Sequence, residues 1–511
     1  MTIHILIDDI VTIVGECLFW NDTIHPALFV CRKWFYIFTP ILYRYISIDE
    51  CPLRVLQSLT DSLTSQKAFI SYGPLVQLIQ LQCSEITYQL LKKIIIACPN
   101  LKDLELNCEF GIDILEIFEC IKNTNLCSLG LMNNPLITYF ADFPCYNLER
   151  LNLMGQSCID EDSIKLLFEN CPNLCYIDLT GCMISSQTFS YILQCLSKLK
   201  GIYVERTDFS DNNLNELIQN CKDTIHCLNI FQSRVTDRGI LNLYPISHKL
   251  EKLFIGEHMT NFGNYNKSLH WTPILNILSN CSRLTELQIR FTSFSTYENE
   301  RNNIEIPTEN FLPCLLKLGI SGHHNDEHII SLILCNAPML EFLELSNFET
   351  EKEWESVLKI TKQFKRVVDI ILDHNLYLKR IFLFTCDWVT NDVIKALCFQ
   401  HSKICEIYVN KCYQITGRCI PYILETKKRW ALYMNDLSEA KWAYKTYSKK
   451  HQLYLLNQNH IISTEPYLPD GNIYETIPNN AQKILRGLNR VDESHMAKIT
   501  IPWKIDPYTL D

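Results

Sequence analysis

A short aliphatic pattern that recurs along most of the chain constrains its fold more than any other feature. In each occurrence three aliphatic residues stand at positions i, i+3 and i+5, as in Leu174, Ile177 and Leu179. Nine of the twelve intervals between successive triples are 22 to 26 residues long, which chance clustering would not produce. The thirteen triples begin at Val76, Leu101, Leu126, Leu148, Leu174, Leu199, Ile225, Leu250, Leu284, Leu315, Leu340, Leu378 and Ile404.

Each triple predicts a short strand that cannot be stable alone. Residues i+3 and i+5 share one face of a strand, whereas i+2 and i+4 point to the other face. Neighbouring units must stack to bury the aliphatic face in a continuous core. Between the strands lie helical patterns such as Ile164, Leu167 and Phe168, followed by a proline such as Pro172 that would end the helix. The repeat therefore predicts an α/β solenoid over residues 73–420.

The stretch from Cys171 to Cys182 resembles the cysteine-containing subtype of leucine-rich repeats. The same resemblance holds for Cys98 to Leu101 and for the stretches that begin at Cys386 and Cys412. It implies curved parallel strands on the inside of a solenoid of about 13 repeats, helices on the outside, and cysteines that fill a buried turn after the strand. We therefore expect structural thiols and no metal site.

Composition limits the classes of function. The net charge of −10 argues against a general nucleic-acid binder, because attraction to phosphates needs an excess of Lys and Arg. The sequence has no run of about 18 apolar residues, which is the pattern that would predict a membrane span. Asp8 and Asp9 stand where a signal peptide would carry basic residues, and the 24 cysteines suit a reducing compartment. We expect a cytoplasmic or nuclear protein that needs no cofactor.

Residues 1–50 lack the repeat and resemble an F-box. The matching stretches are Leu6 to Ile10, Val30 to Trp34, and Leu42 to Arg44; Ile7 replaces the usual Pro, and Tyr43 a frequent Trp. The resemblance implies a small all-α domain that binds a Skp-type adaptor, and through it a cullin, in a ubiquitin ligase of the SCF type. The residues that it assigns to the adaptor surface are Leu6, Ile10, Val30, Cys31, Trp34 and Leu42.

The F-box resemblance also leads to expectations about the other domains and about the function. We expect residues 51–72 to form a linker or N-terminal cap, and residues 421–511 to form a C-terminal cap with an irregular tail. The chain would hold a protein substrate for ubiquitin transfer and proteasomal degradation without catalysing any step itself. Two alternatives remain at this point: a helical cap in place of the F-box, and a scaffold protein that takes no part in ubiquitin transfer.

The substrate would bind the concave strand face, where the side chains at i+2 and i+4 project. Aromatic residues near an arginine are typical of protein interfaces. They stand at these positions in the later repeats, and the candidate substrate residues are Phe254, Phe342, Arg380, Phe382 and Tyr408. The alternatives are that loops or the tail cover these rings, or that the face holds a small-molecule pocket. The sequence contains no catalytic motif that we recognise.

Overall fold

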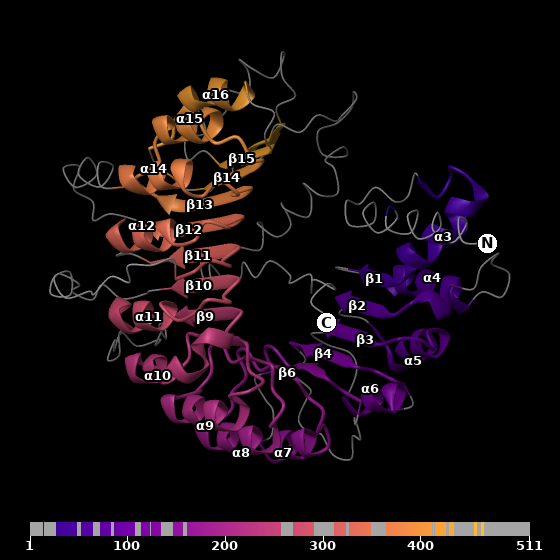
Figure 1. The fold of residues 1–511 in the computed structure, drawn as a ribbon. Coiled ribbons are helices and arrows are strands. Elements are labelled where there is room, and N and C mark those ends of the chain that lie inside the picture. The colour runs from indigo at the N-terminus through magenta and orange to yellow at the C-terminus, as the bar shows by residue number, and fades with distance from the viewer. Residues whose placement is uncertain are drawn as a thin grey trace, which may run out of the picture.

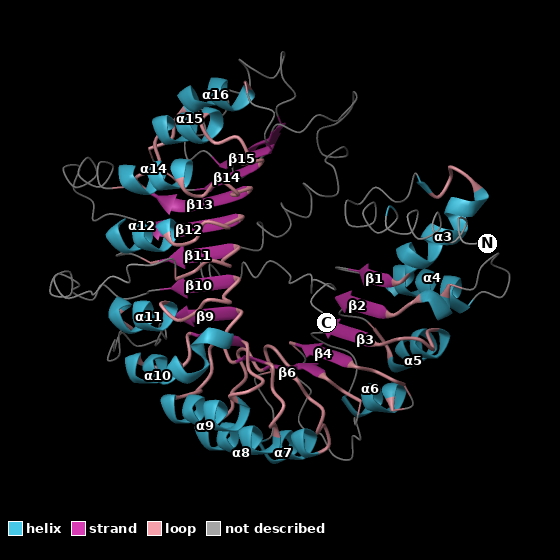
Figure 2. Ribbon diagram, viewed as in Figure 1, coloured by secondary structure: helices cyan, strands magenta, loops and turns pink. Residues whose placement is uncertain are grey.

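The computed structural model describes most of the repeat region and parts of both ends. These are residue 14 and residues 27–48, 53–64, 72–82, 86–107, 114–122, 124–133, 147–156, 161–256, 269–290, 311–322, 327–348, 364–410, 412, 414–425, 429–433, 454–456 and 461–463. The strands line the inner side of an arc and the helices cover its outer side (Figures 1 and 2). No helix in these ranges is long and apolar enough to cross a lipid bilayer.

One sheet of 17 strands runs through the described residues. Strands β1 to β15 pair in parallel with their neighbours in chain order, and β16 and β17 add an antiparallel pair beside β15. The strands are β1 (Tyr45–Ile48), β2 (Leu78–Gln82), β3 (Asp103–Asn107), β4 (Ser128–Met132), β5 (Arg150–Asn152), β6 (Tyr176–Asp178), β7 (Gly201–Tyr203), β8 (Cys227–Phe231), β9 (Lys252–Gly256), β10 (Glu286–Arg290), β11 (Lys317–Ser321), β12 (Phe342–Phe348), β13 (Arg380–Cys386), β14 (Glu406–Asn410), β15 (Arg429–Tyr433), β16 (Tyr454–Leu456) and β17 (Ile461–Ser463).

Helices connect successive strands on the outer side. They are α3 (Arg32–Tyr43), α4 (Leu53–Thr64), α5 (Tyr88–Ala97), α6 (Ile114–Ile121), α7 (Glu161–Glu169), α8 (Ser186–Cys195), α9 (Asp211–Cys221), α10 (Asp237–Asn242), α11 (Trp271–Leu278), α12 (Glu327–Cys335), α14 (Lys365–Asp373), α15 (Asn391–Phe399) and α16 (Ile420–Leu424). Helix α7 shows the local cause: Ile164, Leu167 and Phe168 share its buried face, and Pro172 follows its end.

The aliphatic triples form the core, as predicted. The three residues of all thirteen triples are at most 4% exposed. The register aligns equivalent positions across the sheet, so that Ile177 of β6 lies beside Leu151 of β5 and Ile202 of β7. Burying one such side chain contributes roughly 1.5–3 kcal/mol, so the array is stable only when many units stack.

Side chains that follow the strands donate hydrogen bonds to backbone carbonyl groups of the preceding repeat. The Cys182 thiol donates to the Leu153 carbonyl oxygen over 3.0 Å, and Gln156 donates to Leu131 in the corresponding place one repeat earlier. Burial raises the pKa of Cys182 to about 12, so the group stays protonated and can donate. Cys386 and Cys412 are likewise buried, and their thiols donate to carbonyl groups of the preceding repeat, Leu345 and Leu383.

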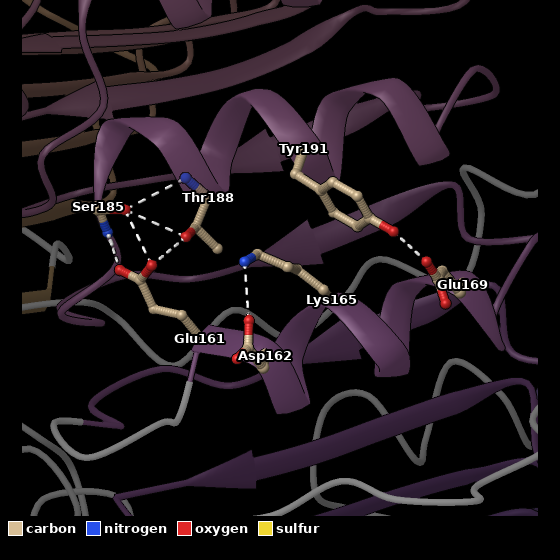
Figure 3. Close-up of polar contacts among 7 residues, drawn as sticks. All are labelled: Glu161, Asp162, Lys165, Glu169, Ser185, Thr188 and Tyr191. Carbon is tan, nitrogen blue, oxygen red and sulfur yellow. Dashed lines mark hydrogen bonds and ion pairs between the residues drawn. The ribbon is translucent and has the colours of Figure 1, made fainter.

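Polar side chains at helix starts also join one repeat to the next. The Glu161 carboxylate of α7 accepts hydrogen bonds from the Ser185 backbone N–H at 3.0 Å, the Ser185 hydroxyl at 3.1 Å and the Thr188 hydroxyl of α8 (Figure 3). These three contacts lower the pKa of Glu161. Asp211 binds Thr236 in an equivalent way, through its backbone N–H at 2.8 Å and its hydroxyl at 2.6 Å. We call this set the helix-start seam, and it includes Asp237 with His270 and Asn391 with Thr416.

The sheet begins and ends outside the predicted range of 73–420. Strand β1 lies within residues 1–50, which were predicted to be all helical, and α4 occupies much of the predicted linker. Tyr43 stands at position i of a triple with Ile46 and Ile48, so a search for aliphatic triples missed this unit. Trp430 takes the i+3 position in β15, where it lies beside Ile407 of β14. The search therefore missed the first unit because Tyr43 stands at position i, and the last unit because Lys427 and Trp430 stand at positions i and i+3.

Helix α3 has a small core of its own. Ala27, Phe38 and Ile41 form this core, and the Trp34 ring packs against Phe38 with centroids 5.1 Å apart. The side chains of α4 instead join the large solenoid core, in which Leu56 is fully buried. The described N-terminal residues thus form a separate cluster beside the first strand.

Candidate functional site

The concave face of the solenoid presents three rows of side chains, at positions i+2, i+4 and i+6 of each repeat. Because the strands are parallel and in register, equivalent residues of successive strands lie side by side in each row. In the later repeats the middle row runs through Phe254, Gln288, Gly319, Glu344, Phe382 and Tyr408. The composition of these rows decides what the face can bind.

An aromatic patch covers the concave face over β12, β13 and β14. It consists of Phe342, Phe382, Phe384 and Tyr408. The Phe382 ring lies between two others, with centroids 5.0 Å from Phe342 and 5.3 Å from Tyr408, and Phe384 lies 5.2 Å from Tyr408. Phe342 and Tyr408 are each only 7% exposed, so Phe382 and Phe384 provide most of the accessible ring surface.

The Arg380 guanidinium lies over the Phe342 ring, 5.4 Å from its centroid. A cation in this position is attracted by the negative face of the ring. Glu406 of β14 lies beside Arg380 in the register. The aromatic patch therefore has a charged border made of an exposed arginine and a carboxylate.

Glu344 stands at the other border of the aromatic patch. Its neighbours in the middle row are Phe382 on β13 and Gly319 on β11, which has no side chain to cover it. Burial raises the pKa of the Glu344 carboxyl, and the positive charge of Arg290 only partly offsets this effect. Desolvation is the physical cause, because a partly buried carboxylate loses water contacts that stabilise its charge.

Arg290 stands on β10 at position i+6, in the row beyond Gln288. Its guanidinium lies 5.5 Å from the centroid of the Phe231 ring of β8. The two side chains meet over Gly256 of β9, where an added Cβ would lie 3.0 Å from the Phe231 ring. Burial lowers the pKa of Arg290, and the charges of Glu205 and Glu344 counteract this shift. A side chain at this position would crowd the Phe231 ring against which the arginine lies.

The first half of the concave face is more acidic, and its described residues form no such cluster of rings. Glu105 on β3, Asp178 on β6 and Glu205 just after β7 are partly buried. Burial raises the pKa of all three carboxyl groups. Asp178 also accepts a hydrogen bond from the Thr180 backbone N–H at 2.9 Å, which opposes its shift.

The structure brings together four of the five predicted substrate residues. Phe342, Arg380, Phe382 and Tyr408 are in contact within the aromatic patch or at its border. Phe254 lies apart on β9, three strands away, and is 3% exposed. Phe384 and Glu344 were not predicted. Phe384 occupies position i+6, one step beyond the two positions used for the prediction.

The predicted adaptor residues divide into three groups. Leu6 and Ile10 lie outside the described residues. Val30 and Cys31 are exposed just before α3, and 61% of Val30 is accessible. Trp34 and Leu42 instead pack against the small core around Phe38.

Two further apolar residues of the same segment are exposed. Phe29 is 86% exposed and Tyr36 is 51% exposed; together with Val30 they form what we call the N-terminal apolar surface. The helical period would have indicated Tyr36, because Trp34, Phe38 and Ile41 define the buried face of α3 and leave Tyr36 off that face. No comparable pattern indicated Phe29, which precedes the helix.

The fold is an α/β leucine-rich-repeat solenoid, and its concave face and N-terminal segment are the two candidate binding surfaces. No family model matches the chain. BTB/POZ domain-containing protein FBL11 of Arabidopsis thaliana is 21% identical over 437 residues, covering 67% of this chain and 46% of that protein. The chain thus spans about half the length of the curated relative that it matches.

Two of the solved structures to which the chain is similar are the following. A chain of the Rad7 and Elc1 complex of yeast has a TM-score of 0.42 at 15% identity, covering 82% of this chain and 92% of that chain. The LRR protein LIC12759 of Leptospira interrogans has a TM-score of 0.35 at 16% identity, covering 76% of this chain and 100% of that chain.

Proposed function

We propose that this protein is the substrate-recognition subunit of an SCF-type E3 ubiquitin ligase. In this proposal the N-terminal segment binds a Skp-type adaptor, and the concave face of the solenoid binds a protein substrate. The observation that carries the proposal is the N-terminal apolar surface of Phe29, Val30 and Tyr36, which lies on the segment that resembles an F-box. Large apolar side chains that are exposed within one short segment are typical of protein interfaces.

In this proposal the two surfaces have different roles. The adaptor joins the chain to a cullin, and the solenoid holds the substrate close to the activated ubiquitin. Ubiquitin transfer is then accelerated by proximity, because holding two reactants together avoids the entropic cost of a bimolecular encounter. The chain itself contributes no catalytic group, and its place of action is the cytoplasm or the nucleus, where the substrate is marked for proteasomal degradation.

Co-purification of the full chain with a purified Skp-type adaptor tests the proposal. The test variant is Val30→Glu, Tyr36→Glu, because both side chains are exposed and their replacement leaves the small core around Phe38 intact. The matched control is Met183→Glu, which places a charge on an apolar side chain of the solenoid that is 75% exposed. We expect the wild type and the control to retain the adaptor and the double variant to lose it.

A second candidate function is a scaffold protein without a role in ubiquitin transfer. The observation that favours it is the close join between α3 and the sheet: Tyr43 stacks on Tyr72 with centroids 4.3 Å apart, and the Arg44 carbonyl accepts from the Gln77 N–H at 2.9 Å. This arrangement suits a cap that shields the first strand. Failure of the folded wild-type chain to bind the adaptor would support the scaffold function.

A further inference from the structure

We infer that the concave surface around Glu344 binds a lysine or arginine side chain of the protein partner, next to an apolar side chain that packs on Phe382. This inference rests on the proposed function only in taking the concave face as the site of a protein partner. It names the chemistry of the occupant: a segment that carries a basic residue beside an apolar one. Adaptor binding by the N-terminal segment plays no part in it.

The first observation is that Glu344 lacks a polar contact. Its carboxylate makes no hydrogen bond, and no ion pair within 4.0 Å, with any residue that the structure describes. Leaving a partly buried carboxylate without hydrogen bonds is unfavourable, because desolvation penalises the charged form. A basic side chain of a partner would supply the missing charge and hydrogen bonds.

The second observation is that the described basic groups of the neighbouring strands already have partners. Lys252 and Lys317 each lie 3.9 Å from the Glu286 carboxylate between them. Arg290 lies over Phe231, and Arg380 lies over Phe342. Glu344 is the charged residue of the middle row in these strands, and the charge of Arg290 offsets its burial only in part. A further positive charge would therefore be complementary to this part of the face.

The third observation is the aromatic surface beside the carboxylate. Phe382 lies next to Glu344 in the register, and its ring continues into Tyr408. Ring faces attract cations, and the position of Arg380 over Phe342 shows that these strands can hold a guanidinium over a ring. The same rings offer apolar surface to the residue that follows or precedes the basic one.

On the side of β11, Glu344 has Gly319 as its neighbour, which has no side chain to cover it. Gln288 of β10 extends over Gly319, since an added Cβ at this glycine would lie 3.3 Å from Gln288 Cγ. The middle row thus presents, in order, an amide, a backbone surface, a carboxylate and a ring. This order matches a peptide whose basic side chain meets Glu344 and whose adjacent apolar side chain meets Phe382.

Fluorescence anisotropy with four pools of labelled octapeptides tests the inference on the full chain. Each pool has a fixed leucine next to a fixed Arg, Lys, Gln or Glu, and the remaining positions are randomised. We expect the Arg and Lys pools to bind about tenfold more tightly than the Gln and Glu pools, which corresponds to about 1.4 kcal/mol. In Glu344→Gln this preference should vanish while binding of the Gln pool is kept.

Two variants separate the possible explanations. Glu105→Gln is the matched control, because it removes another concave carboxyl whose pKa is raised by burial, but on β3; it should keep the preference. Phe382→Ala should weaken binding of all four pools, because it removes the apolar contact. Circular dichroism and thermal melting verify that each variant is folded.

Four results would overturn the inference: equal binding of all pools, tightest binding of the Glu pool, an unchanged preference in Glu344→Gln, or no binding by any pool. Equal binding that is lost in Phe382→Ala would reject the basic occupant and keep the concave face as a partner site. Absence of binding by any pool would reject the concave site itself. Neither result would bear on adaptor binding, which the Val30→Glu, Tyr36→Glu variant tests separately.

Discussion

Glu161 and Glu344 are two partly buried glutamates in very different surroundings. Glu161, at the start of α7, accepts hydrogen bonds from Ser185 and Thr188 of the next repeat, and its pKa is lowered. Glu344, on the concave face of β12, makes no hydrogen bond with the described residues, and burial raises its pKa. The difference separates a carboxylate that holds two repeats together from one that is available to a partner.

The comparison also shows how one repeat can serve two purposes. The helix-start seam satisfies its polar groups within the chain, since Ser185 and Thr236 both find a carboxylate in the preceding repeat. The concave face stacks rings and leaves a carboxylate beside them. Stability therefore comes from the core and the seam, and the rows of side chains on the inside remain for the proposed partner.

The largest effect is expected for Glu161→Ala. It removes the acceptor of three hydrogen bonds and should lower the free energy of unfolding by about 1–2 kcal/mol, measured by urea denaturation at pH 7. Asp162→Ala is the control, because the Asp162 side chain is 88% exposed in its ion pair with Lys165. The control should change stability by no more than about 0.5 kcal/mol. Equal effects in both variants would contradict a structural role of Glu161.

Gly239→Ala should lower stability by about 1 kcal/mol, although alanine is intrinsically the better helix former. The added Cβ would lie 2.3 Å from Asp211 Oδ1 and 2.7 Å from Val235 Cγ1, so the carboxylate must leave Thr236. Thermal and urea unfolding would measure the loss. In a double-mutant cycle with Asp211→Ala, the two losses should be less than additive, and strict additivity would show that the substitution acts elsewhere.

Glu344→Gln should leave the unfolding free energy unchanged or raise it by up to about 1 kcal/mol, since it removes a desolvated charge that has no ion-pair partner. Urea denaturation at pH 7, beside the same measurement on Glu161→Gln, provides the comparison. A clear loss of stability in Glu344→Gln would mean that this carboxylate holds the fold together, as Glu161 does.

The smallest effect is a difference in pH dependence between these two glutamates. The folded-state pKa of Glu161 lies below 4.5, so its stabilisation is present above that pH and is lost as the pH falls through the folded-state pKa. The folded-state pKa of Glu344 lies above 4.5, so its penalty is present at high pH and is relieved as the pH falls through that higher value.

Stability curves of the two Gln variants against the wild type, from pH 7 to pH 3, would reveal the opposite signs. At pH 7 the wild type should be more stable than Glu161→Gln and no more stable than Glu344→Gln. On acidification the Glu344→Gln curve should approach the wild-type curve first, because its pKa is the higher of the two. If the Glu161→Gln curve approached the wild-type curve first, the pKa directions assigned to Glu161 and Glu344 would be wrong.

The sequence predicted the solenoid well, because its aliphatic residues recur with the period of the structure. The terminal repeats were missed because Tyr43 replaces an aliphatic residue in the first, and Lys427 and Trp430 replace two in the last. Four of the five predicted substrate residues lie together because parallel strands in register turn equal positions in the repeat into spatial neighbours.

Other features could not be predicted from the repeat. The Arg290 contact with Phe231 depends on Gly256 in the strand between them, and on how far each side chain leans across it. The outward position of Phe29 depends on how the chain enters α3. Both are consequences of packing between residues that the local pattern does not relate.

The sequence alone determined the alternation of strand and helix, the buried aliphatic core and the concave positions, because these follow from the period of the side chains along the backbone. Only the tertiary structure decided which carboxylates are satisfied. Glu161 and Glu344 have the same side chain, but their hydrogen bonds and burial depend on residues of neighbouring repeats. Desolvation and hydrogen bonding act through space, so the packing of one repeat on the next made one glutamate structural and left the other available for binding.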